Sequence, residues 1–173
     1  MIGRIPIMFD RTVRPEWIDF ALEQYLSSES EADLRVTLRR FMSANVEGVF
    51  TQQKTALQLQ RAVGYKSPLT RKELEGYYER LASQTPGERN PLRFEILCRS
   101  NPFFRDCVSV LRKIRESGVE CFELKHVYER VTALYGDRGS VPRRVRYVLQ
   151  TLAAFEMVTN VGGKWRIEDS LRA

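Results

Sequence analysis

The segment from Ser140 to Ile167 constrains the fold of this chain more than any other. It reads SVPRRVRYVLQTLAAFEMVTNVGGKWRI. Ser140 suits a helix cap through its hydroxyl, and Pro142 suits the first turn because its missing N–H is not needed there. Apolar side chains then recur at helical spacing: Val141, Val145, Val148, Leu149, Leu152 and Phe155. This pattern predicts a helix over 141–155 with one buried face.

Two β-rich runs follow this helix at once. They cover residues 157–161 and 164–167 and flank Gly162-Gly163. Both central residues of a two-residue hairpin turn need a positive φ, which glycine adopts freely. We therefore expect a short β-hairpin directly behind the helix.

Two further helices are predicted ahead of this pair, over 102–117 and 122–135. The first begins at Asn101-Pro102 and carries a strongly apolar face. Three helices and a hairpin in this order are typical of a winged helix-turn-helix, in which the third helix enters the major groove of DNA. We expect an all-α protein, a helical body with a C-terminal winged helix-turn-helix that carries one short hairpin.

The first half of the chain is also predicted to be helical. Thr70 and Glu73 match the capping box S/T-x-x-E, and residues 1–13 form an extended opening with Ile2, Ile5, Ile7 and Phe9. Residues 85–91, TPGERNP, are the most loop-like stretch. The expected organisation is a helical domain over 1–84, available for protein contacts, a connecting loop over 85–91, and the winged-helix domain over 90–173.

Positive charge is concentrated in the second half of the chain. The net charge is +6, yet residues 1–98 carry 14 basic and 13 acidic side chains. Residues 99–118 carry 5 basic and 2 acidic side chains, and residues 137–167 carry 6 basic and 2 acidic ones. A basic excess on one region favours a polyanionic partner, whereas a merely solvated basic face is the alternative.

The basic residues of the predicted winged helix form the candidate nucleic-acid site. Arginines in the first turns of the third helix are placed to pair with guanine or to neutralise phosphate, and those of the hairpin to grip phosphate. The helix supplies Arg143, Arg144, Arg146 and Gln150, and the hairpin supplies Lys164 and Arg166. Arg112, Lys113 and Arg115 extend the basic track along the helix over 102–117.

Other kinds of site are not indicated. The spacing of Cys98, Cys107 and Cys121 matches no zinc or disulfide pattern, and we expect Cys98 and Cys107 to be buried thiols. His126 has no partner placed for catalysis, and no phosphate-binding glycine loop, HExxH or G-x-S-x-G occurs. We expect no enzyme activity, no catalytic residue, no cofactor and no metal.

No apolar run is long enough to span a membrane, and the N-terminus lacks the apolar core of a signal peptide. We therefore expect a cytoplasmic protein with no membrane contact.

The order of segments resembles the BrxA family, the small DNA-binding component of BREX phage-defence systems. The resemblance lies in the block LRFEILCRSNPFFRDCVSVLRKI and in the terminal helix VPRRVRYVLQTLAAFEMV. It implies a helical body with winged-helix character and other components of a defence complex as partners. The family has also been likened to the RNA-binding protein NusB, which keeps RNA as an alternative ligand.

These observations predict a non-enzymatic protein that binds double-stranded DNA, and the resemblance implies a place in a prokaryotic anti-phage system. One alternative is a protein-interaction adaptor, which would expose four aromatic side chains as contacts: Tyr77, Tyr78, Phe103 and Phe104. A second alternative is an RNA-binding helical protein. Fold alone does not decide among them.

Overall fold

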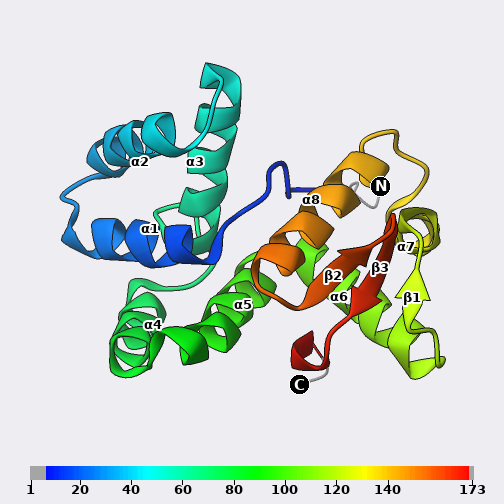
Figure 1. The fold of residues 1–173 in the computed structure, drawn as a ribbon. Coiled ribbons are helices and arrows are strands. Elements are labelled where there is room, and N and C mark those ends of the chain that lie inside the picture. Colours follow the sequence, from blue (N-terminus) through cyan, green and yellow to red (C-terminus); the bar gives the residue numbers. More distant parts are fainter. Residues whose placement is uncertain (1–6, 172–173) are drawn as a thin grey trace. The chain divides into compact units, whose positions relative to one another are not determined.

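The computed structural model describes residues 7–171, which form eight α-helices, two short 3₁₀ helices and one small sheet (Figure 1). The predicted fold class is confirmed, because the protein is mostly helical with a short β-hairpin near its C-terminus. The chain divides into two compact units. The helical unit is Val13–Asn101, and the winged-helix unit joins the segment up to Thr12 to the chain from Pro102 onward.

The helical unit consists of five α-helices and one 3₁₀ turn. They are α1 (Pro15–Ser27), α2 (Glu31–Asn45), α3 (Val49–Val63), α4 (Arg71–Ser83), η1 (Pro86–Glu88) and α5 (Arg89–Ser100). The predicted capping box is confirmed at α4. The Thr70 hydroxyl accepts a hydrogen bond from the Glu73 amide, and the Glu73 carboxylate accepts one from the Thr70 amide.

The border between the units lies away from the loop we expected. Residues 85–91 were expected to connect two domains, whereas they form η1 and the first turn of α5. Helix α5 packs against α1, α3 and α4 and buries Leu92, Ile96 and Leu97. Because the partners of this apolar face lie in the first half of the chain, the division falls between Asn101 and Pro102.

The winged-helix unit follows the order helix, strand, helix, helix, strand, strand. Its elements are α6 (Pro102–Glu116), β1 (Cys121–Phe122), α7 (Leu124–Tyr135), α8 (Val141–Ala154), β2 (Val158–Val161), β3 (Lys164–Ile167) and the 3₁₀ turn η2 (Asp169–Leu171). The sheet is antiparallel with the order β1-β3-β2. Strand β1 was not predicted, because two residues are too short to show an alternating pattern.

The turn of the hairpin is formed as expected. Gly162 and Gly163 have φ angles of 59° and 85°, and Val161 pairs with Lys164 across the turn. Two successive positive φ values are those of a type I′ turn, whose twist matches that of the flanking strands. The Asn160 carboxamide oxygen also accepts a hydrogen bond of 3.2 Å from the Gly163 amide.

The predicted apolar face of α8 is buried at every position, with its six side chains at most 2% exposed. The predicted cap is wrong, because the Ser140 hydroxyl accepts no hydrogen bond from the backbone amides of the first turn. Its φ and ψ of −83° and −15° are helical, whereas a capping residue needs an extended backbone to reach that turn. The hydroxyl instead accepts a hydrogen bond of 3.3 Å from Arg144 Nη1.

Residues 7–12, here called the N-terminal arm, have no helix or strand and pack within the winged-helix unit. Ile7 and Phe9 are buried, and the Phe9 ring lies 5.2 Å from that of Phe104 on α6. The extended opening that the sequence predicts is therefore an arm attached to this unit. Ile2 and Ile5 lie outside the described residues.

Candidate nucleic-acid interface

The outer face of α8 carries Arg143, Arg146 and Gln150, here called the α8 ridge. All three are exposed, and their spacing of three and four residues places them on one stripe of the helix. Within residues 7–171, the side chains of Arg143 and Arg146 have no hydrogen-bond or ion-pair partner. Both guanidinium groups are therefore available to a ligand.

Arg144, which the sequence groups with these two arginines, points elsewhere. Its Nε and Nη2 atoms each lie 2.9 Å from Asp10 Oδ1 in the N-terminal arm, and both side chains are mostly buried. A charge-assisted pair of this kind fixes the arm to the helix. Arg144 therefore has a structural contact within the unit, unlike its two neighbours.

The N-terminal arm runs along α8, because its successive residues 10–12 contact Arg144, Tyr147 and Gln150 in turn. The Arg11 guanidinium lies 5.5 Å from the centre of the Tyr147 ring, and the Thr12 hydroxyl donates a hydrogen bond of 2.7 Å to Gln150. Sequence analysis missed Arg11, which adds a positive charge next to the ridge. No local pattern signals this contact, because its partners are 136 residues apart.

The hairpin carries less available charge than its sequence indicates. Arg166 donates to Glu168 Oε1 over 3.1 and 3.0 Å, and the Thr159 hydroxyl donates to the same atom. Hydrogen bonds from Thr159 and then Arg166 lower the pKa of Glu168, so this pair stays ionised. Lys164 is exposed at the turn. Of the two predicted phosphate contacts, Arg166 is thus already neutralised in part.

The predicted extension along α6 is also partly engaged. Arg112 Nε donates a hydrogen bond of 3.0 Å to the Leu171 carbonyl, and Arg115 forms an ion pair of 3.5 Å with Glu120. Lys113 is exposed. The three residues therefore do not form a row of equivalent cations, and the α8 ridge remains the most accessible basic feature of the predicted site.

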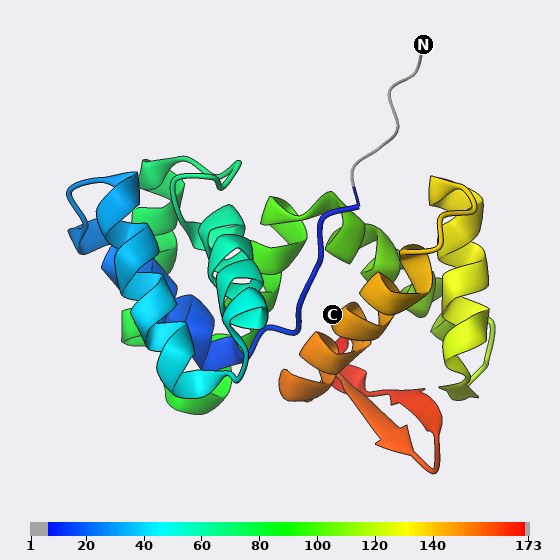
Figure 2. The same cartoon turned by 90° about the horizontal axis from the view of Figure 1, so that it is seen from above.

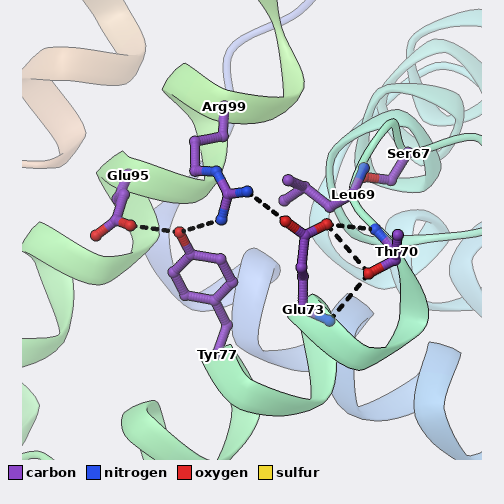
Figure 3. A network of polar contacts seen from close by, with 7 residues as sticks. All are labelled: Ser67, Leu69, Thr70, Glu73, Tyr77, Glu95 and Arg99. Carbon is purple, nitrogen blue, oxygen red and sulfur yellow. Dashed lines mark hydrogen bonds and ion pairs between the residues drawn. The ribbon is translucent and has the colours of Figure 1, made fainter.

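A network of polar side chains in the helical unit connects α4 with α5 (Figure 3). The Tyr77 hydroxyl donates to Glu95 and accepts from Arg99, which also donates to Glu73. Burial first, and then the hydrogen bond to Glu95, raise the pKa of Tyr77, so the phenol stays protonated at neutral pH. Each of these groups bonds to another, so the network joins α4 to α5.

The thiols and acids of the described residues form no group able to hold a metal ion. Cys107 is buried as expected, and burial together with Asp106 raises the pKa of its thiol. Cys98 is only half-buried, because its side of α5 is partly open to solvent. His126 accepts a hydrogen bond of 3.3 Å from the Glu123 amide and so helps to cap α7.

Three of the four aromatic side chains that the adaptor hypothesis needs at the surface are in the core. Phe103, Phe104 and Tyr77 are at most 3% exposed, whereas Tyr78 is 41% exposed. Within residues 7–171, every helix is too short or too polar to cross a lipid bilayer. Comparisons with models of protein families, with curated proteins and with solved structures found no match.

Proposed function

We propose that this protein binds double-stranded DNA through the α8 ridge, with the β2–β3 hairpin against the adjacent backbone. The observation that carries the proposal is a pair of exposed arginines on the third helix of a winged-helix unit, both without a partner among residues 7–171. Winged helices place this helix in the major groove. From Arg143 to Gln150 the ridge spans about 10 Å along the helix, which suits a groove about 12 Å wide.

The roles within the site follow from the contacts of each side chain. Arg143 and Arg146 are the base or phosphate contacts, and Gln150 is a weaker contact because it already accepts a hydrogen bond from Thr12. Lys164 is the phosphate contact of the hairpin. Arg144 holds the arm that carries Arg11 beside the helix. A place in an anti-phage defence complex stays a prediction from the family resemblance.

The test measures the affinity of the full chain for a labelled duplex at two salt concentrations. Arg143→Ala combined with Arg146→Ala should weaken binding at least about tenfold, since each base or phosphate contact is worth roughly 1 kcal/mol or more. If both arginines neutralise phosphates, the salt slope should fall by about 1.8.

The matched control is Arg105→Ala combined with Arg130→Ala, which removes the same charge from exposed positions of α6 and α7. It should change the affinity less than about threefold. Equal losses in both variants, or none in the ridge variant, contradict the proposed site. Stronger competition by structured RNA than by duplex DNA favours the RNA-binding alternative.

A further inference from the structure

The helical unit contains a second basic feature, a groove between α2 and α3, which lie side by side (Figures 1 and 2). It has a volume of about 300 Å³, at the lower end of the range for ligand pockets. Its lining includes Arg35 and Arg39 from α2, and Phe50, Lys54 and Gln60 from α3. We call it the α2–α3 groove.

The groove is positively charged. Four cations line it, Arg35, Arg39, Lys54 and Lys66, against the single carboxylate of Glu31. Glu31 pairs with Lys66 over 3.4 Å, whereas the side chains of Arg35 and Arg39 have no partner among residues 7–171. These two arginines lie four residues apart on α2 and so point to the same side. An anionic ligand is the chemical complement of this surface.

An exposed aromatic ring lies among the charges. Phe50 is 65% exposed although it is a large apolar residue, and Lys54 Nζ lies 5.5 Å from the centre of its ring. A solvent-exposed phenyl ring beside cations is the arrangement on which an unpaired base stacks while its phosphates are neutralised. The ring therefore favours a ligand with a flat face over a simple anion.

A buried acceptor without a donor lies in the wall of the groove. Gln60 is 2% exposed, and its Oε1 atom is buried and accepts no hydrogen bond within the described chain. Such an atom costs free energy unless a donor reaches it. The imino or amino group of a base supplies an N–H, after a small movement of the side chains that cover the oxygen.

We propose that the α2–α3 groove binds single-stranded nucleic acid. Arg35 and Arg39 hold phosphates, Phe50 stacks on a base, and Gln60 accepts a hydrogen bond from the base edge. A duplex does not fit this role, because its bases are stacked on one another and have no free face for Phe50. The groove lies in the other unit from the α8 ridge, so this proposal is independent of the duplex-binding function.

The experiment measures binding of the full chain to a labelled single strand of roughly 12 thymidines, which is within the usual site sizes of single-strand binders. Arg35→Ala with Arg39→Ala should weaken binding at least about tenfold and reduce the salt slope by about 1.4. Phe50→Ala should weaken it about tenfold through lost stacking. Phe50→Ala removes no charge and should leave binding of duplex DNA within about twofold, which separates this proposal from the duplex site.

Two controls make the result decisive. Arg40→Ala with Lys72→Ala removes the same charge from exposed positions of this unit outside the groove, and should change affinity less than about twofold. An abasic strand of equal length should bind less tightly than the thymidine strand and respond little to Phe50→Ala. Gln60→Leu should weaken binding of the thymidine strand without lowering the unfolding midpoint, because it removes an unsatisfied buried oxygen.

Four outcomes overturn the proposal. Three of them are no binding of the single strand, equal losses in the groove variant and its charge-matched control, and equal affinity for the abasic strand. The fourth is displacement of the strand by an acidic peptide at the concentration at which unlabelled strand displaces it, since the groove then recognises protein carboxylates.

Discussion

The helical unit and the winged-helix unit use arginine differently. In the helical unit several arginines join one helix to another: Arg93 pairs with Asp19, Arg99 with Glu73 and Arg80 with Glu95. On α8, in contrast, Arg143 and Arg146 have no partner among the described residues. A guanidinium that is already paired stabilises the fold, whereas one left in solvent is available for a ligand.

This comparison explains how basic and acidic residues are distributed along the sequence. The first 98 residues are nearly neutral because acids accompany the basic residues, and several of these acids are the partners of arginines in the ion pairs. Arg35 and Arg39 of α2 have no partner among residues 7–171, and both line the α2–α3 groove. Local pairing, more than net charge, therefore identifies the candidate ligand surfaces.

The largest expected effect is that of Arg93→Ala. Arg93 is 8% exposed and donates to both carboxylate oxygens of Asp19 and to Asn90. Among residues 7–171 its removal leaves Asp19 with only the longer contact of 3.8 Å to Arg89, so the free energy of unfolding should fall by about 2.5 kcal/mol. Urea unfolding followed by Trp17 fluorescence in a Trp165→Phe background measures this unit. If the loss of stability is no larger than that caused by Arg40→Ala, the paired arginines of the helical unit do not stabilise its fold.

A smaller effect distinguishes neighbouring arginines of α8. Arg144→Ala should lower the free energy of unfolding by about 1.5 kcal/mol, because the mostly buried Asp10 loses this ion pair. Arg143→Ala should change it by less than about 0.5 kcal/mol, as expected for an exposed side chain without a hydrogen bond or ion pair among residues 7–171. Unfolding followed by Trp165 fluorescence tests both. Equal losses of stability in the two variants would contradict the distinction between Arg144, which holds the arm, and the exposed Arg143.

The smallest expected effect is on the stability of the protein at acidic pH. Hydrogen bonds from the Thr70 backbone, from Arg99 and from the Thr70 hydroxyl lower the pKa of Glu73 below its ordinary value of 4.5 (Figure 3). A lowered pKa adds stability above pH 4.5, and this is lost as pH falls through the value in the folded state. Glu73→Gln should therefore destabilise the protein at pH 7, and its difference from the parent should shrink below pH 4.5.

Glu79→Gln, an exposed acid on the same helix, is the control for that titration. Urea midpoints measured from pH 7 to pH 3 for both variants give the comparison. A Glu73→Gln difference that stays constant with pH would contradict a role for the ionised carboxylate.

Much of the fold could be predicted from local patterns. The apolar face of α8, the Gly162-Gly163 turn and the Thr70–Glu73 capping box depend on residues close in sequence, and all three are present. Strand β1 and the unit border at Asn101 depend on partners far along the chain, which a local pattern does not contain.

The candidate site was predictable only in part for the same reason. Spacing places Arg143 and Arg146 on the outer face of α8, but it gives no sign that Asp10 pairs with Arg144 or that Glu168 pairs with Arg166. The α2–α3 groove was missed altogether. Arg35 and Arg39 read as ordinary surface residues until Phe50 and Gln60 are seen to line the same cavity.

The N-terminal arm makes the winged-helix unit discontinuous in sequence, and this has a consequence for folding kinetics. Asp10 and Arg144 are 134 residues apart, so their contact closes a long loop and contributes a high contact order. We therefore expect docking of the arm to be a late, slow phase of refolding. Arg144→Ala should slow that phase, because only the buried Ile7 and Phe9 then hold the arm, while the phase reported by Trp17 keeps its rate.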